Sequence, residues 1–223
     1  MSGGATGASP RPGRWPVYAR SSTITAQPSS IDNGIAYLRD EVMPNLPEIE
    51  GWVGLSLMAD RASGRCIATT AWEFEAAMHA SRERIQPLRD GLARVLNGPV
   101  DLVEEWEIAL MHRVHPAGDG ACTRCTWVQG DPGESDRMID VFKADVLPEV
   151  EMIDGFCSAS LFADRATGRG VAATVWASRA ALDNSREQTD RIRTTSTQRR
   201  GARVLEVAEF DLAFAHLRVP EMA

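Results

Sequence analysis

The chain has little of what marks nucleic-acid-binding, membrane or secreted proteins. Its 24 Lys and Arg are outnumbered by 31 Asp and Glu, for a net charge of −7, so it lacks the basic surplus that binds phosphate backbones or anionic membranes. No segment approaches the roughly 20 apolar residues of a membrane helix, and residues 1–16 contain no apolar signal-peptide core. We therefore expect no nucleic-acid or membrane partner, a cytoplasmic location, and a disordered tail over residues 1–16.

Cysteine is scarce as well. The four cysteines show no spacing that repeats along the chain, so no disulfide framework is indicated and reduced thiols are expected. Cys122 and Cys125 have the spacing of a metal-binding or redox pair. They fall in a predicted strand, however, where residues three apart point to opposite faces and cannot share a metal. We expect no metal site.

The sequence contains an internal duplication. Arg20–Pro116 aligns without a gap with Arg124–Pro220, and about a third of the aligned positions are identical. A unit of this length exceeds solenoid and propeller repeats and is long enough for a core of its own. The sequence therefore predicts a first repeat over residues 17–116, a linker over 117–120 and a second repeat over 121–220.

Each repeat reads as strand, helix, strand, strand, helix, strand. In the first repeat we expect a strand over 18–26 and a helix closed by Pro44, as Pro148 should close its counterpart, because an internal proline removes a helix hydrogen bond. A hairpin of 51–60 and 65–72 and a last strand over 100–112 follow. The second helix between them carries one stripe: Met78, Ser81, Ile85, Leu88, Leu92 and Val95.

This order is that of the ferredoxin-like unit, a four-stranded antiparallel sheet with both helices on one face. The middle strands are apolar on both faces, since Val53, Leu55 and Leu57 alternate with Trp52 and Met58. Such a sheet needs a second cover, which the other repeat's sheet can provide. We predict an α+β fold in which two ferredoxin-like βαββαβ repeats pack sheet to sheet as an intramolecular dimeric α+β barrel. The protein would be a monomer with an internal pseudo-dimer, or self-associate further.

A short passage carries a family resemblance. It runs from the helix-ending Pro44 through Gly51-Trp52 and the Asp-Arg-x-x-Gly hairpin to Thr70-Ala71-Trp72, and the second repeat has Pro148, Gly155-Phe156 and Thr174-Val175-Trp176 in the same places. Over residues 17–116 and 121–220 the chain resembles two antibiotic biosynthesis monooxygenase (ABM) domains of the dimeric α+β barrel superfamily. Single domains of that family usually pair, so this chain looks like the fused dimer.

The resemblance implies two functions from different classes. One is a cofactor-independent monooxygenase acting on a small aromatic or polyketide-like substrate, and the other is a non-catalytic small-ligand-binding or scaffolding barrel. The chain departs from active members at Ser21, Ser22 and Thr23, where an asparagine is typical. No catalytic residue is assigned, and whether the protein is an enzyme stays open.

Haem-degrading members of the family offer a distant third interpretation. The resemblance would place their iron-binding helix histidine nine or ten residues beyond the strand tryptophan. Those positions hold Ser81 and Arg82 in the first repeat and Ser185 and Arg186 in the second. We therefore expect no haem or other cofactor.

The resemblance also places a ligand pocket between sheet and helices. We expect it in the first repeat, to hold a small hydrophobic molecule. Its candidate residues are Trp72, Ser81, Ile35, Leu38, Leu88, Leu92 and Arg20.

The matching second-repeat stripe has turned polar at Thr189, Ser196 and Arg199, and unsatisfied groups there would cost roughly 1–3 kcal/mol each. We therefore do not expect a pocket there.

Most of these residues also have a purely structural interpretation. The tryptophans can be core anchors, and the serines can bond back to their own helices. Arg20 with Glu105, and Arg124 with Glu209, recur on strands that adjoin in a ferredoxin-like sheet, and we expect structural ion pairs. His112 and His216 recur too, but single histidines are weak signs of acid–base chemistry.

Overall fold

The computed structural model describes residues 16–198 and 201–222. Apart from Pro16, the expected N-terminal tail lies outside these residues, and so does Arg199. The strands in the described ranges are β1 (Val17–Thr25), β2 (Trp52–Ala59), β3 (Arg65–Trp72), β4 (Val100–Arg113), β5 (Cys122–Gln129), β6 (Phe156–Asp164), β7 (Arg169–Trp176) and β8 (Arg203–Leu217).

The helices fall in the places that the duplication predicts, with shorter pieces than expected. The α-helices are α1 (Ile31–Tyr37), α2 (Glu75–Ala80), α3 (Arg82–Val95), α4 (Ser135–Val141), α5 (Leu147–Glu151), α6 (Arg179–Asn184) and α7 (Arg186–Gln198). Short 3₁₀ and π turns adjoin them: η1 (Pro28–Ser30), η2 (Leu38–Val42), η3 (Met43–Asn45), η4 (Pro132–Glu134) and η5 (Phe142–Val146). None of these helices combines the length and apolarity that crossing a bilayer requires.

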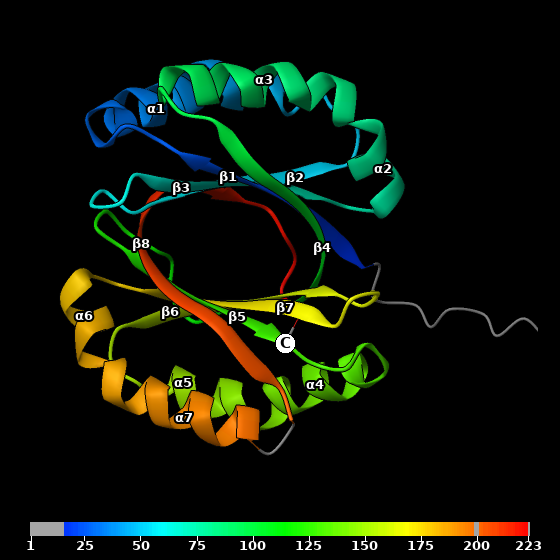
Figure 1. Cartoon of the computed structure of the whole chain (residues 1–223), viewed down its shortest axis with the longest axis vertical. Helices are drawn as coiled ribbons and strands as arrows, with labels where there is room; N and C mark the ends of the chain where they lie inside the picture. The colour runs from blue at the N-terminus through cyan, green and yellow to red at the C-terminus, as the bar shows by residue number, and fades with distance from the viewer. Residues whose placement is uncertain (1–15, 199–200, 223) are drawn as a thin grey trace, which may run out of the picture.

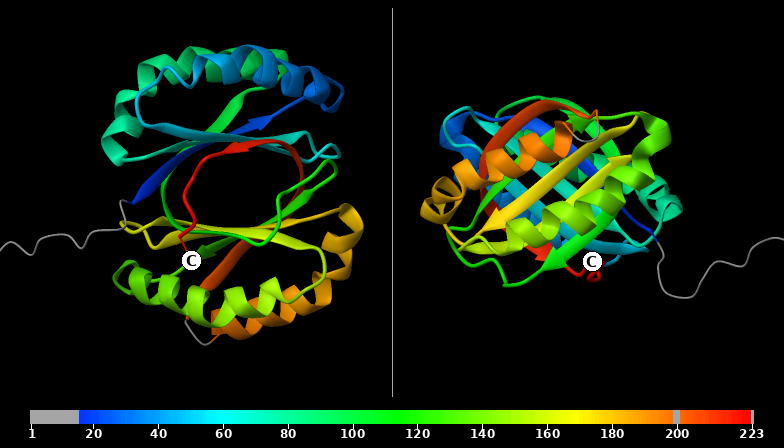
Figure 2. Two further views of the ribbon diagram at one scale, coloured as in Figure 1. Left: turned by 180° about the vertical axis from the view of Figure 1, so that it is seen from behind. Right: turned by 90° about the horizontal axis from the view of Figure 1, so that it is seen from below.

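The strands close into one antiparallel barrel in the order β1-β3-β2-β8-β5-β7-β6-β4. Within this circle β2-β3-β1-β4 is the sheet of the first repeat and β6-β7-β5-β8 that of the second. The circle closes because β2 pairs with β8 and β4 with β6. The helices lie outside the two sheets (Figures 1 and 2). The predicted fold, a dimeric α+β barrel built from two ferredoxin-like repeats, is confirmed.

Three cores follow from this arrangement. One lies between the first sheet and its helices and includes Trp72 and Leu38, and its counterpart in the second repeat includes Trp176 and Phe142. The third lines the barrel interior and includes Trp106 and Trp127, from different repeats. The apolar inner faces of both sheets are thus buried against each other, as the alternation on the middle strands predicts.

Two expectations about helices are wrong in detail. The second helix of each repeat is not continuous but breaks at Ser81 and Ser185, where α2 meets α3 and α6 meets α7. Pro148 does not end its helix, because it stands at the first turn of α5, where the missing amide hydrogen has no helical partner to lose.

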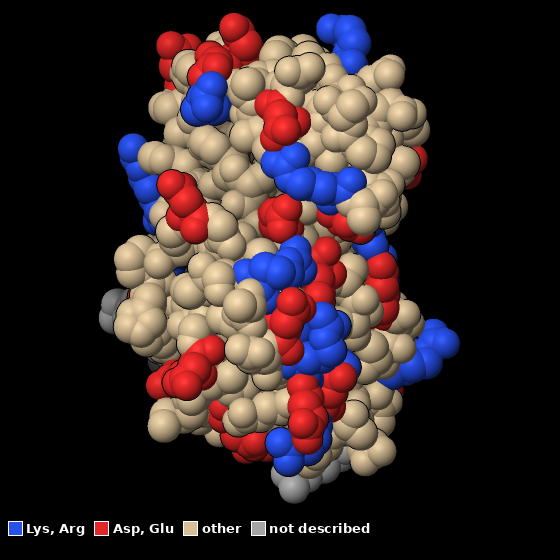
Figure 3. Space-filling model, turned by 90° about the vertical axis from the view of Figure 1, so that its left-hand side faces the viewer, with Lys and Arg blue, Asp and Glu red and all other residues tan. Residues whose placement is uncertain are grey.

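Ion pairs join the two repeats on one side of the barrel. Arg61 of the first repeat lies 3.4 Å from Asp211, a residue of β8 in the second repeat. Asp211 also pairs with Arg179 at 2.8 Å. Figure 3 shows basic and acidic side chains interleaved along this flank, without a field of one sign. Exposed pairs of this kind contribute little stability but fix which charges meet.

The closed barrel makes a prediction about the isolated first repeat. Residues 17–116 alone would expose the edges of β2 and β4 and the inner sheet face that the second repeat covers. Such edges and apolar faces promote association. We expect the fragment to self-associate in analytical ultracentrifugation, whereas a monomer with a cooperative thermal transition would contradict this.

Candidate functional site

A buried arginine lies at the centre of the first repeat, between its sheet and α2. Arg20 on β1 is directly opposite Glu105 on β4, and its Nε and Nη2 donate to Oε1 of that carboxylate at 2.9 and 2.7 Å. Its Nη1 donates to Ser81 Oγ at 3.1 Å and its Nη2 to the Met78 carbonyl at 2.6 Å. The guanidinium therefore ties β1 and β4 to the end of α2.

The second repeat builds the same cluster with one more hydroxyl. Arg124 donates to Glu209 Oε1 at 3.0 and 2.9 Å, to Ser185 Oγ at 2.9 Å and to the Leu182 carbonyl at 2.8 Å. Thr189 adds an acceptor at 2.7 Å. Both Arg–Glu pairs are expected from the sequence, and the structure brings both together. Their contribution to stability stays a prediction.

The helix break described above belongs to this cluster. The Met78 carbonyl accepts from Arg20 and, at 2.7 Å, from Ser81 Oγ. Ser185 bonds to the Leu182 carbonyl in the same way. These serines bond back to their own helices and hold the arginine, which is the structural interpretation of both residues.

Glu105 is the titratable member of the first cluster. Burial raises its pKa, but hydrogen bonds from Arg82 and Arg20 and their positive charges outweigh burial, so the net pKa lies below the ordinary value of 4.5. Arg82 Nη2 lies 2.9 Å from Oε2, and His79 Nε2 lies 3.2 Å from the same oxygen. The carboxylate thus stays ionised in its folded environment.

We expect the Arg20–Glu105 pair to be strongly coupled in stability. Arg20 is 4% exposed and Glu105 27%, so Arg20→Met or Glu105→Met alone should cost about 2–4 kcal/mol by leaving a charge or its partners unsatisfied. The double variant should cost clearly less than the sum. Urea unfolding of all four proteins measures this, and a coupling energy near zero would contradict it.

The lowered pKa of Glu105 also predicts a pH dependence. The unfolded state binds this proton more readily than the folded state, so stability from the pair is complete above the unfolded pKa and is lost as pH falls through the folded pKa. Between about pH 5 and pH 3, Glu105→Gln should lose less melting temperature than the wild type does. Glu83→Gln, an exposed change on α3, is the control and should follow the wild type. Equal losses in all three proteins would show that Glu105 does not contribute.

The remaining pocket candidates of the first repeat are packed into its outer core. Trp72 and Leu38 are fully buried, Leu92 and Ser81 nearly so, and Ile35 and Leu88 are partly buried against them. Trp72 donates through Nε1 to Thr70 Oγ1 at 3.1 Å. All seven candidates therefore contribute to one packed layer, and their role in ligand binding stays a prediction.

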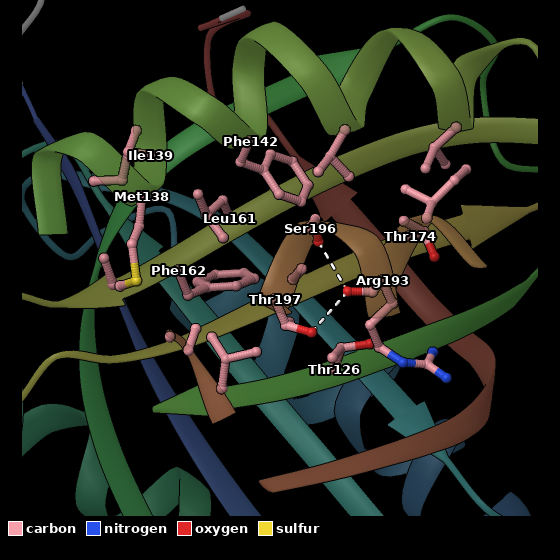
Figure 4. Close-up of a pocket in the computed structure, with 18 of the residues that line it drawn as sticks. Thr126, Met138, Ile139, Phe142, Leu161, Phe162, Thr174, Arg193, Ser196 and Thr197 are labelled. Carbon is pink, nitrogen blue, oxygen red and sulfur yellow. Dashed lines mark hydrogen bonds between the residues drawn. The ribbon is translucent and has the colours of Figure 1, made fainter. Parts of the chain in front are cut away.

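The second repeat holds a cavity between its sheet and helices. It has a volume of about 130 Å³. Its floor comes from β5, β6 and β7, and its walls from α4, η5 and α7 (Figure 4). The lining includes Thr126, Met138, Ile139, Phe142, Leu161, Ala172, Thr174, Ile192, Arg193, Ser196 and Thr197.

The expectation that the second repeat has no pocket is wrong, because this cavity lies there. Ser196 stands where the first repeat has Leu92, and Thr189 where it has Ile85, so smaller side chains leave space. Their hydroxyls are not stranded: Ser196 donates to the Arg193 carbonyl at 3.0 Å and Thr189 to the Ser185 carbonyl at 3.0 Å. The polar residues Thr189 and Ser196, which were expected to exclude a pocket from the second repeat, are therefore the feature of the sequence that indicates the cavity.

The electrostatics of the cavity suit binding more than proton transfer. Its titratable lining consists of Arg124, Arg169 and Arg193, and no carboxylate, imidazole or thiol of the described residues lines it. The haem-ligand position Ser185 is engaged with Arg124, and no histidine is placed to hold a haem iron, so the lining does not fit that group. No cluster suited to a metal ion occurs in the described part of the chain.

The cysteines and histidines add no nucleophile or base to this cavity. Cys122 packs in the second outer core and Cys125 in the barrel interior, on opposite faces of β5 as the strand geometry predicts. Burial raises the pKa of Cys125 to about 12, which leaves it an unreactive thiol. His112 lies 3.0 Å from both Glu151 and Glu221, partners that the sequence did not indicate, and His216 stacks on Trp52.

Relatives in sequence come from Mycobacterium tuberculosis (strain ATCC 25618 / H37Rv). The uncharacterized protein Rv2557 is 51% identical over 224 residues, which cover 100% of both chains. The uncharacterized protein Rv2558 is 53% identical over 222 residues, covering 99% of this chain and 94% of its own. This chain belongs to their family. No protein-family model matches it.

Solved structures similar to this chain include proteins described as oxidase-like, as monooxygenase-like, or as related to antibiotic biosynthesis monooxygenases. An anthrone oxidase-like protein matches with a TM-score of 0.65 at 13% identity, covering 94% of this chain and 96% of its own. A monooxygenase-like protein from Listeria innocua matches with a TM-score of 0.53 at 10% identity, covering 88% and 94%. A ferredoxin-fold protein from Listeria monocytogenes 4b F2365, related to antibiotic biosynthesis monooxygenases, matches with a TM-score of 0.51 at 10% identity, covering 89% and 96%. At these identities the likeness establishes the ABM-like barrel fold.

Proposed function

We propose that this protein is a small-ligand-binding barrel that holds an aromatic or polyketide-like molecule in the cavity of its second repeat. The observation that carries the proposal is a cavity of about 130 Å³ whose walls are largely apolar and carry some hydroxyl groups. Among the described residues that line it, the only charged ones are arginines. This volume is about ten times the ~10–15 Å³ that one water requires, which suits one or two fused rings. The Thr189 and Ser196 hydroxyls already donate to helix carbonyls, and the Arg124 guanidinium donates to Glu209, Ser185 and Thr189, so the cavity would select such a molecule mainly by shape.

Cofactor-independent monooxygenation is the second candidate. It is favoured by the likeness to the anthrone oxidase-like and monooxygenase-like structures. In that reaction a CH₂ group between aromatic rings would become a carbonyl, with one atom of O₂ in the carbonyl and the other in water, and the substrate would supply all four electrons. The absence of a base among the described lining residues ranks this candidate second.

A single substitution tests the binding site. Ser196→Leu gives α7 the residue that α3 has at Leu92 and should fill the cavity. We expect it to weaken binding of menadione at least about tenfold, since the ring would lose its space, while Ser196→Ala leaves affinity within about threefold. Isothermal titration measures both, and equal affinity of the leucine variant and the wild type would contradict the proposal.

Oxygen consumption separates the two candidates. Anthrone added to the wild type without metal or cofactor should give no O₂ uptake above the protein-free rate if the barrel only binds. Uptake that the Ser196→Leu variant loses would establish the monooxygenase instead.

A further inference from the structure

The barrel interior is a second cavity, separate from the one in the second repeat. It has a volume of about 340 Å³, and all eight strands contribute to its lining. Much of its wall is apolar, with Trp106 and Trp127 from different repeats and Met58, Met111 and Phe162 among the side chains that line it. Serine and threonine hydroxyls interrupt this wall, so the interior has the mixed lining of a site for an amphipathic molecule.

Two polar side chains at one end of this cavity have unused donors. Thr123 Oγ1 and Arg113 Nη2 are both enclosed, and neither has a hydrogen-bond partner among the described residues. Thr123 is 1% exposed. Buried polar groups are almost always satisfied in native proteins, so a pair of orphaned groups on one cavity wall points to a missing partner.

The two orphaned groups belong to one row of the sheet. Thr123 is opposite Val175, Val175 is opposite Ser158, and Ser158 is opposite Arg113. All four residues line the interior. Arg113 is the last residue of β4, and the other three lie near the start of β6, the end of β7 and the start of β5.

Charge distinguishes Arg113 from two other arginines that reach toward the interior. Arg65 pairs with Glu206 and lies over the Trp127 ring, and Arg169 pairs with Glu104 at 2.7 Å and lies over the Trp106 ring. The guanidinium of Arg113 instead donates to the Val219 carbonyl at 2.8 Å, and no ion pair of it with a carboxylate occurs in the described ranges. The nearby Glu221 carboxylate accepts from the Arg113 backbone amide at 3.1 Å and lies 3.0 Å from His112. A partly buried guanidinium in this arrangement favours an anionic partner.

The chain closes this end of the cavity after its last strand. Arg218 donates through its backbone to the Val53 carbonyl, and Met222 to the Met111 carbonyl, each at 2.8 Å. Val219 and Met222 are buried in the interior core. The two residues that carry the orphaned donors thus lie at the closed end of the barrel interior.

We propose that the barrel interior binds a medium-chain carboxylic acid, with its carboxylate on Arg113 and Thr123 and its apolar chain between the tryptophans. A carboxylate accepts from both donors and neutralises the guanidinium, while a chain of apolar carbons matches the remaining wall. This site depends neither on the cavity of the second repeat nor on the function proposed for it.

Decanoate and decanol, titrated into the full chain by calorimetry, test the head-group assignment. Arg113→Met should weaken decanoate binding at least about tenfold through loss of a charge-assisted hydrogen bond and leave decanol within about twofold. Arg113→Lys should retain decanoate binding within about fivefold. Ser196→Leu, which fills the other cavity, should change neither affinity.

If the Arg113→Met variant does not fold, Thr123→Val tests the same site, because valine keeps the shape of the threonine side chain. It should weaken decanoate several-fold and leave the melting temperature equal or higher, since an unsatisfied hydroxyl is removed. 2-Bromodecanoate should quench tryptophan fluorescence in the wild type, because Trp106 and Trp127 line the site. The proposal is overturned if the wild type binds no decanoate at millimolar concentration, if both the Arg113 and Thr123 variants bind it like the wild type, or if Ser196→Leu abolishes binding.

Discussion

The pairing of β4 with β6 and of β2 with β8 is the constraint on which the rest of the structure depends. A ferredoxin-like sheet has two open edges and, here, an apolar face that its own helices do not cover. Both needs are met by the other repeat, which continues each edge and supplies the opposite wall. Because the repeats are joined in one chain, this closure is intramolecular and needs no association between molecules.

Closure leaves the helix layers free to diverge, because each layer packs mainly on its own sheet. Both layers keep the same arginine cluster, in which Arg20 or Arg124 joins a glutamate, a serine and a helix carbonyl. The two helix layers differ in the volume of the side chains that follow this cluster along α3 and α7. Where α3 carries Ile85 and Leu92, α7 carries the smaller Thr189 and Ser196, both of which line the cavity of the second repeat.

The sequence was sufficient for the barrel because that prediction depends on patterns shared by many residues. A gapless repeat, strand alternation and the position of Arg20 opposite Glu105 each constrain a whole element. The cavity depends instead on residual volume, a small difference between large packed volumes that composition does not reveal. The polarity of Thr189 and Ser196 does not exclude a cavity, because helix carbonyls satisfy their hydroxyls. The segment after β8, in which Val219 and Met222 are buried, cannot be predicted from the spacing of apolar residues, because it is neither helix nor strand.

The two cavities differ in the state of their polar groups, and this difference bears on their roles. Around the cavity of the second repeat Thr189 and Ser196 are satisfied within the protein, so that space can remain empty without an electrostatic penalty. In the barrel interior Thr123 and Arg113 keep donors that the described chain leaves unsatisfied. A satisfied, apolar space selects ligands by shape, whereas an unsatisfied one selects them by charge. One duplicated fold thus provides two compartments with different selection rules, the first arising from divergence of one repeat and the second from the meeting of both.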